Sequence, residues 1–244
     1  IGQYAKFSIF LDFAGTTAGT FYIDDLVHME GDGGTSAAPK LPVDFENSDI
    51  SYEWFGFGAA DFGPIPAGII ENPDQSGINT SSNVLEVVKV DGAQVWAGAS
   101  MDLEGAIDFS GSTTVKIKVW SPRAGTPILF KTEVSTSTPD ANGNPTVFVE
   151  VEQSTTVANA WEELTFDLST FDAFDPANAY DRLIVFPDFN NPGLGESFYF
   201  DDFILGDGST GGGTADCVPE TAENIDPANG PINWTFLTDD DAHE

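Results

Sequence analysis

Two adjacent aspartates, Asp201 and Asp202, stand in a strand-like run of aromatic residues. Adjacent side chains of a strand point to opposite faces, so one of these carboxylates is expected to face inward or to lie at the sheet edge. An uncompensated carboxylate is costly there, and a hard cation with oxygen ligands would compensate it. The pair therefore predicts a cation site, and the alternative is a solvated acidic pair or a backbone cap at the strand end.

Basic and aromatic residues alternate with aliphatic ones in the run 115–120. This period of two predicts a half-buried strand with its valines and isoleucine inside and Trp120 outside, beside two of the six lysines of the chain. Those lysines are Lys116 and Lys118. In the run 128–133 the same alternation places Lys131 and Glu133 together, and we expect them to line the face of Trp120. The alternative is a salt-bridged face on which a loop covers Trp120.

A third group of candidate residues lies in two short aromatic segments, 52–57 and 94–98. Side by side, Trp54 and Phe55 from the first segment and Trp96 from the second would form an aromatic platform at a loop-rich end of the domain. A core position for Trp54 is the alternative, because the internal repeat described below also has an aromatic residue there.

Short strands must position these residues. Alternating or aromatic runs predict strands over 84–90, 95–103, 115–120, 128–135, 146–152, 161–167, 180–187 and 197–205, and Gly, Pro, Asn and Ser clusters separate them. No stretch has convincing helical periodicity. Eight or more short strands in about 165 residues predict an all-β, antiparallel β-sandwich, most simply a jelly roll.

The composition limits the possible partners. The 244 residues include 40 Asp and Glu against 8 Lys and Arg, for a formal net charge of −32. Such a surface repels nucleic-acid backbones and anionic lipids. Hydrophobic residues make up 41% of the chain, enough for a sizeable core, and no apolar run approaches the ~20 residues of a membrane helix. The single cysteine, Cys217, excludes an intrachain disulfide.

Segments near both ends of the chain repeat with a spacing of about 180 residues. The matched pairs are 4–13 with 180–189, 21–26 with 198–203, and 43–50 with 225–232. Trp54 aligns with Phe236 when the last match is extended. The repeat predicts that the chain is part of a tandem array.

The expected division of the chain follows from this repeat. Residues 1–31 would be the last strands of a preceding module, and 32–40 a linker. Residues 41–206 would form the one complete module. A second linker would cover 207–216, and 217–244 would begin the next module.

Three motifs of the central module carry a resemblance: Asp-Phe-Glu at 44–46, Trp-Ala-Gly at 96–98 and Phe-Tyr-Phe-Asp-Asp-Phe at 198–203. They resemble jelly-roll carbohydrate-binding modules, and more specifically the repeated modules of surface glycan-binding and adhesin-like proteins of glycan-foraging bacteria. The resemblance covers 41–206 and fragments of both ends.

The resemblance implies a structural Ca2+ between the first and last strands, with Asp44, Glu46 and Asp201 as ligands beside Asp202. Glu46 departs from the repeat, in which Ala228 takes its place. It also implies that aromatic rings stack on sugar rings while charged groups bind the hydroxyls. The ligand residues would then be Trp54, Phe55, Trp96, Trp120, Lys131 and Glu133.

Motifs of enzymes are missing from the sequence. It contains no nucleophile elbow, zinc spacing or phosphate loop, and its two histidines, His28 and His243, fall in the partial flanking modules. We therefore expect a non-catalytic module of a bacterial cell-surface or secreted protein that binds a neutral polysaccharide such as a β-glucan. The expected partners are this polysaccharide and neighbouring modules, without nucleic acid or membrane insertion. The alternative is a structural or adhesive repeat with no glycan ligand of its own.

Overall fold

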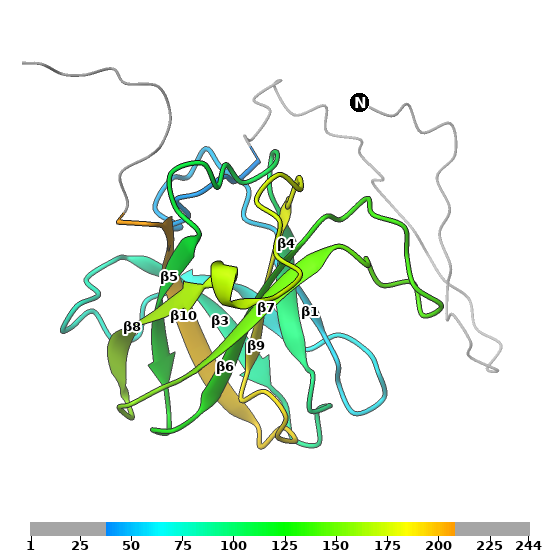
Figure 1. The fold of residues 1–244 in the computed structure, drawn as a ribbon. Coiled ribbons are helices and arrows are strands. Elements are labelled where there is room, and N and C mark those ends of the chain that lie inside the picture. Colours follow the sequence, from blue (N-terminus) through cyan, green and yellow to red (C-terminus); the bar gives the residue numbers. More distant parts are fainter. Residues whose placement is uncertain (1–37, 208–244) are drawn as a thin grey trace, which may run out of the picture. The chain divides into compact units, whose positions relative to one another are not determined.

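The structure is a computed structural model that describes residues 38–207 (Figure 1). This range contains the predicted complete module, 41–206. The predicted flanking modules 1–31 and 217–244, and most of both predicted linkers, lie outside the described residues. Across the described range, no helix is long and apolar enough to cross a membrane.

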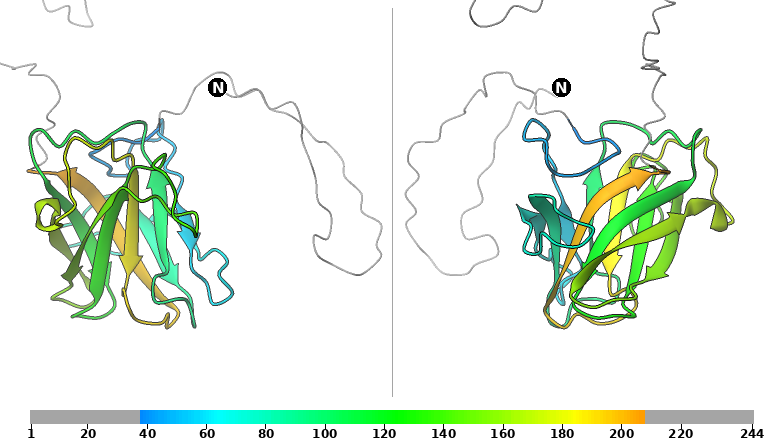
Figure 2. Two further views of the ribbon diagram at one scale, coloured as in Figure 1. Left: turned by 45° about the vertical axis from the view of Figure 1, so that its right-hand side comes forward. Right: turned by 90° about the vertical axis from the view of Figure 1, so that its left-hand side faces the viewer.

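Ten strands form two antiparallel five-stranded sheets that face each other (Figures 1 and 2). Sheet A has the order β1 (Phe55–Phe57), β4 (Gly98–Asp102), β9 (Arg182–Pro187), β6 (Pro127–Glu133) and β7 (Phe148–Ser154). Sheet B has the order β2 (Ala67–Glu71), β3 (Asn83–Lys89), β10 (Glu196–Leu205), β5 (Thr114–Ser121) and β8 (Ala160–Asp167). A short 3-10 helix, η1 (Leu168–Thr170), follows β8. The predicted all-β sandwich of jelly-roll type is confirmed.

The main core lies between the two sheets and is built by the expected alternation. On β5, Val115, Ile117 and Val119 are fully buried, and they pack with Phe130 of β6 and Phe200 of β10 in one hydrophobic cluster. Because every second side chain of these strands faces the core, the others lie on the outer faces of the sandwich.

The sequence did not predict β1 and β2, which are the edge strands of their sheets at the start of the domain. β1 has only three residues, and Gly56 at its centre packs against the backbone of Ile65. A Cβ atom at position 56 would lie 2.0 Å from the Ile65 carbonyl oxygen. This glycine therefore allows β1 to close onto the chain that leads into β2, and it fixes the outward positions of Phe55 and Phe57.

Candidate functional site

The outer face of sheet A carries a second hydrophobic cluster, separate from the core. Leu129, Ile184 and Phe186 are buried there, and Phe57 and Phe189 pack against them. The register explains this arrangement, because Phe186 pairs with Leu129 and lies in one row with Phe57 across three neighbouring strands. These buried side chains form the support for the more exposed aromatic residues beside them, and exposed apolar patches mark interaction sites when they are large.

Five aromatic rings form a continuous line on this face, which we call the aromatic ribbon: Phe62, Trp96, Phe57, Phe186 and Phe189. Their successive ring centroids are 6.2, 6.2, 5.6 and 5.7 Å apart. Trp96 stacks on Phe57 with an interplanar angle of 21°. Phe186 is buried in the cluster, whereas the other end of the ribbon is exposed to solvent. At that end, the side chain of Trp96 is 39% and that of Phe62 72% exposed.

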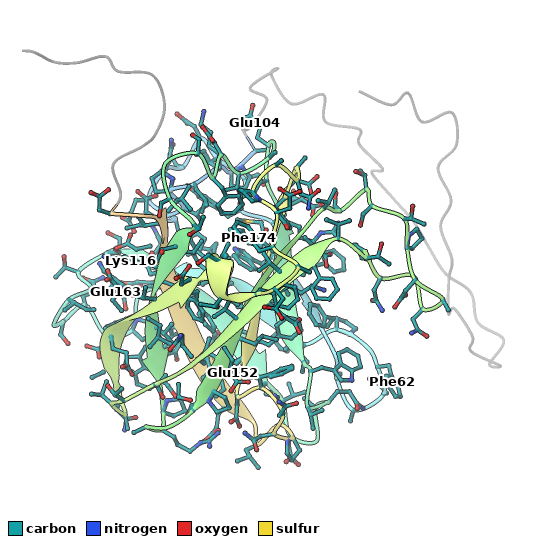
Figure 3. All side chains as sticks on the ribbon, in the orientation of Figure 1. Phe62, Glu104, Lys116, Glu152, Glu163 and Phe174 are labelled. Atoms are coloured by element: carbon teal, nitrogen blue, oxygen red, sulfur yellow. The ribbon has the colours of Figure 1, made fainter. Side chains whose placement is uncertain are left out.

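Phe62 lies in the loop between β1 and β2 and projects from the periphery of the domain (Figure 3). Its backbone has a positive φ of 66°, a conformation that costs a bulky residue about 1–3 kcal/mol. Two backbone hydrogen bonds hold the loop, from Ala59 to Gly63 and from Phe62 to Ala59. The loop therefore presents an exposed ring in a conformation that is costly for phenylalanine, beside Trp96.

Charged residues form a ladder next to the ribbon, which we call the charge ladder: Asp102, Arg182, Glu133 and Lys131. Arg182 donates Nε and Nη2 to the carboxylate of Asp102 and Nη1 to Glu133 Oε1 at 2.9 Å. Glu133 Oε2 pairs with Lys131 Nζ at 2.9 Å. The hydrogen bonds to Asp102, and after it to Glu133, raise the pKa of Arg182 although burial opposes this.

A groove of about 630 Å³ opens at the β1 side of this face. Its polar and aromatic walls include Ser51, Glu53, Phe55, Ser100, Asp102 and Arg182. Phe55 is 75% exposed, so its ring is available to a ligand in the groove. Polar side chains therefore share the groove wall with one exposed aromatic ring.

The structure brings together four of the predicted ligand residues on this face. Phe55, Lys131 and Glu133 lie on strands of sheet A, and Trp96 lies in the loop before β4, not on a strand as expected. Glu133 is only 3% exposed, so it is too buried for direct contact with a ligand.

Trp54 does not belong to this site. It is 7% exposed and packs in the core against Phe203, with ring centroids 5.6 Å apart. Trp54 directly precedes Phe55, the first residue of β1, and the side chains of the two residues point to opposite sides, Trp54 inward and Phe55 outward. The expected ligand contact of Trp54 is wrong, and the core alternative suggested by the repeat agrees with its position.

Trp120 lies on the other sheet, so the expectation that it shares a face with Lys131 and Glu133 is wrong. Its indole donates to the carboxylate of Asp74 at 3.1 Å, and the indole of Trp161 donates to the Asp74 carbonyl at 2.7 Å. Asp74 belongs to the β2–β3 connection, which therefore covers both tryptophans. Lys116 and Glu163, labelled in Figure 3, form an ion pair of 3.2 Å on the same face. This is the alternative of a salt-bridged face with a loop-covered Trp120.

The four residues expected to bind a cation differ in burial and in their bonding partners. A bulge interrupts the pairing of β10 with β5 after Asp201, so the two aspartates do not simply alternate. Asp201 is fully buried beneath the β2–β3 connection, where Asn79 Nδ2 donates to it at 2.9 Å. Burial, and after it the nearby Asp202, raises the pKa of Asp201 to about 6. Asp202 pairs with Lys118.

Asp44 and Glu46 are exposed and accept hydrogen bonds from backbone amides. Within 38–207, no three Asp, Glu, His or Cys side chains are close enough together to hold a metal ion. The expected four-residue ligand set is thus not assembled among the described residues, and Asp201 is the one of the four that is buried without an ion pair.

Several residues of this face could not be predicted from the sequence: Phe57, Phe62, Asp102, Arg182 and the aromatic residues of 186–189. The run 182–187 is almost entirely apolar, so its periodicity did not separate an outward from an inward face. The charge ladder joins residues that are distant in the sequence, and only the strand register brings them together.

No family model and no curated protein matches this sequence. Among solved structures, the chain is similar to a family 11 carbohydrate-binding module from Clostridium thermocellum in complex with a β-1,3-1,4-mixed-linked tetrasaccharide. The two are 15% identical, with 66% of this chain and 92% of that chain covered and a TM-score of 0.44.

Two further structures are also similar. The CBM22-1 xylan-binding domain of Xyn10C from Paenibacillus barcinonensis is 15% identical, with 67% of this chain and 90% of that chain covered and a TM-score of 0.38. The K2 cleaved adhesin domain of Lys-gingipain is 16% identical, with 63% and 90% covered and a TM-score of 0.40.

Proposed function

We propose that this domain is a non-catalytic glycan-binding module that holds a neutral polysaccharide, such as a β-glucan, on the outer face of sheet A. The observation that carries the proposal is the aromatic ribbon, five contacting rings on a sheet face that ends in two exposed rings, Trp96 and Phe62. Sugar rings have flat apolar faces that stack on such side chains. A glycan is therefore the ligand class that the ribbon and its polar neighbours fit best.

The geometry also favours an extended chain over a small ligand. Trp96 and Phe62 offer the exposed rings of the ribbon, and Phe55 beside the groove adds a second contact area. Ser100, Asp102 and Glu53 offer oxygen atoms to sugar hydroxyls there. Binding to one shallow face would be weak, and tandem modules would raise it through effective concentration.

The proposed setting is a secreted or cell-surface bacterial protein whose modules are arranged in tandem. A high negative charge suits an extended and soluble array. A stabilising Ca2+ also remains a proposal, and only the buried carboxylate of Asp201 among the expected ligands supports it. Chelation that leaves the melting temperature unchanged would remove Ca2+ from the proposal.

Affinity electrophoresis in gels that contain laminarin tests the function. We expect retardation of the wild-type domain, and an affinity about tenfold lower for Trp96→Ala and Phe62→Ala. Phe62 is mostly exposed, so its removal should leave thermal stability nearly intact, whereas Trp96→Ala also removes the stacking on Phe57 and should lower stability moderately.

Ile78→Ala is the matched control, because Ile78 is an exposed apolar residue in the β2–β3 connection on the other sheet. It should be retarded like the wild type. Absence of retardation with every glycan of a broad panel would contradict glycan binding and favour a structural repeat module.

A further inference from the structure

Glu133 occupies an unusual place in the proposed binding face, because it is a nearly buried carboxylate on the outer side of a sheet. Its two oxygens are divided between two cations, Oε1 with Arg182 and Oε2 with Lys131. Arg182 is shared further with Asp102, and Lys131 also lies over the ring of Phe148 at 4.5 Å from its centroid. The ladder is therefore a closed network in which each basic group has at least one carboxylate.

These two cations are the only basic residues on the five strands of sheet A, which also carry four acidic residues. The acidic residues are Asp102, Glu133, Glu150 and Glu152. Recognition of a carboxylate or sulfate group needs a basic side chain whose donors are available, and like charges across an interface are repulsive. The face has donors for anions, but the ladder uses them internally.

We propose that Glu133 sets the charge selectivity of this face. By holding Lys131 and Arg182 in the ion network, it leaves them unavailable to uronic-acid or sulfated glycans, so that the face accepts uncharged chains. This inference rests on the proposed glycan-binding function. Because Glu133 is too buried to contact the ligand, it is a positioning residue that acts through its two basic partners.

The test compares binding of laminarin and of carboxymethylated laminarin, which share one backbone and differ in charge. The wild type should bind the neutral glycan at least about tenfold more tightly at low ionic strength. Glu133→Gln keeps the size of the side chain and releases one charge-assisted bond to each cation. It should improve binding of the carboxymethylated glycan about tenfold, and high salt should cancel the gain.

Two further variants make the test specific. Glu152→Gln changes the net charge equally at an exposed position of the same face (Figure 3), and it should leave the preference for the neutral glycan within about threefold of the wild type. Asp102→Asn, at an exposed side chain, releases Arg182 from the other side of the ladder. It should shift the preference in the same direction as Glu133→Gln, and it covers the case in which Glu133→Gln does not fold.

The outcomes separate the inference from the function on which it rests. If the wild type binds neither glycan and no other glycan of the broad panel, the proposed function fails, and the inference fails with it. If the wild type binds laminarin but Glu133→Gln, when folded, and Asp102→Asn retain its charge preference, the function stands and the inference is overturned. An equal effect of Glu152→Gln would also overturn the inference, because selectivity would then follow net charge alone.

Discussion

Replacing Asp201 by asparagine should remove a pH-dependent cost from the folded state. Burial raises the pKa of this carboxyl from 3.8 to about 6. An acid whose pKa is higher in the folded state binds its proton more tightly there, so stability falls as the pH rises from 3.8 to 6. One pKa unit corresponds to about 1.4 kcal/mol. The ionised Asp201 therefore costs the folded domain about 3 kcal/mol above pH 6.

Urea unfolding followed by tryptophan fluorescence measures this cost at about pH 4, 5, 6 and 7. Many carboxylates titrate over this range, so the informative quantity is the difference between the wild type and Asp201→Asn at each pH. The asparagine loses part of the hydrogen bonding to Asn79 and to the Asp202 amide, which adds an offset that does not depend on pH. Relative to the variant, the wild type should lose about 2 kcal/mol between pH 4 and 7.

Glu152→Gln serves as the control, because it removes a carboxylate from an exposed position, and its difference from the wild type should change little with pH. Parallel stability curves for the wild type and Asp201→Asn would refute the assignment of a costly buried carboxylate. The same titration tests Ca2+ binding. An ion at Asp201 would offset the cost and should therefore stabilise the wild type above pH 6 but not near pH 4.

Two other predictions concern stability. Burial lowers the pKa of Lys89 from 10.5 to about 8, so the unfolded state binds more protons than the folded state between these pH values. The unfolding free energy of the wild type should therefore rise by roughly 2–3 kcal/mol relative to that of Lys89→Met from pH 8 to 10. A difference in urea unfolding that does not change with pH would contradict this. Asp74→Ala removes the acceptor of the Trp120 indole and should cost about 1–2 kcal/mol of unfolding free energy while laminarin retardation persists. Loss of that retardation would show that sheet B takes part in binding.

The alternation of side chains was the most reliable guide to local structure. It predicted the inner and outer residues of β5 because each apolar residue there is separated by a polar or aromatic one. The same rule could not predict which side chains of β9 face outward, because its six residues are mostly apolar on both faces. β9 lies at the centre of sheet A with apolar surface on both sides, and periodicity does not distinguish this from a strand buried in a larger core.

The candidate site shows a similar division. Trp96 and Phe55 were recognisable as aromatic residues in glycine-rich segments, and Lys131 and Glu133 as neighbours on one strand face. Their grouping with Trp54 and Trp120 failed, because residue type does not tell on which side of the chain a ring packs or in which sheet a strand lies. Trp54 entered the core, and Trp120 was covered by the β2–β3 connection through Asp74.

The all-β class, the sandwich and the composition of the strands are local properties, so they could be read from residue order and short-range periodicity. The assignment of strands to sheets and their register are long-range properties, because pairing joins residues as distant as Asp102 and Arg182. That register placed Phe57 and Phe186 in one row and enclosed two cations around Glu133, and the loops that carry Phe62, Trp96 and Phe189 completed the ribbon. A binding surface on a β-sheet is therefore decided by tertiary structure, since its residues come from strands that the chain order keeps far apart.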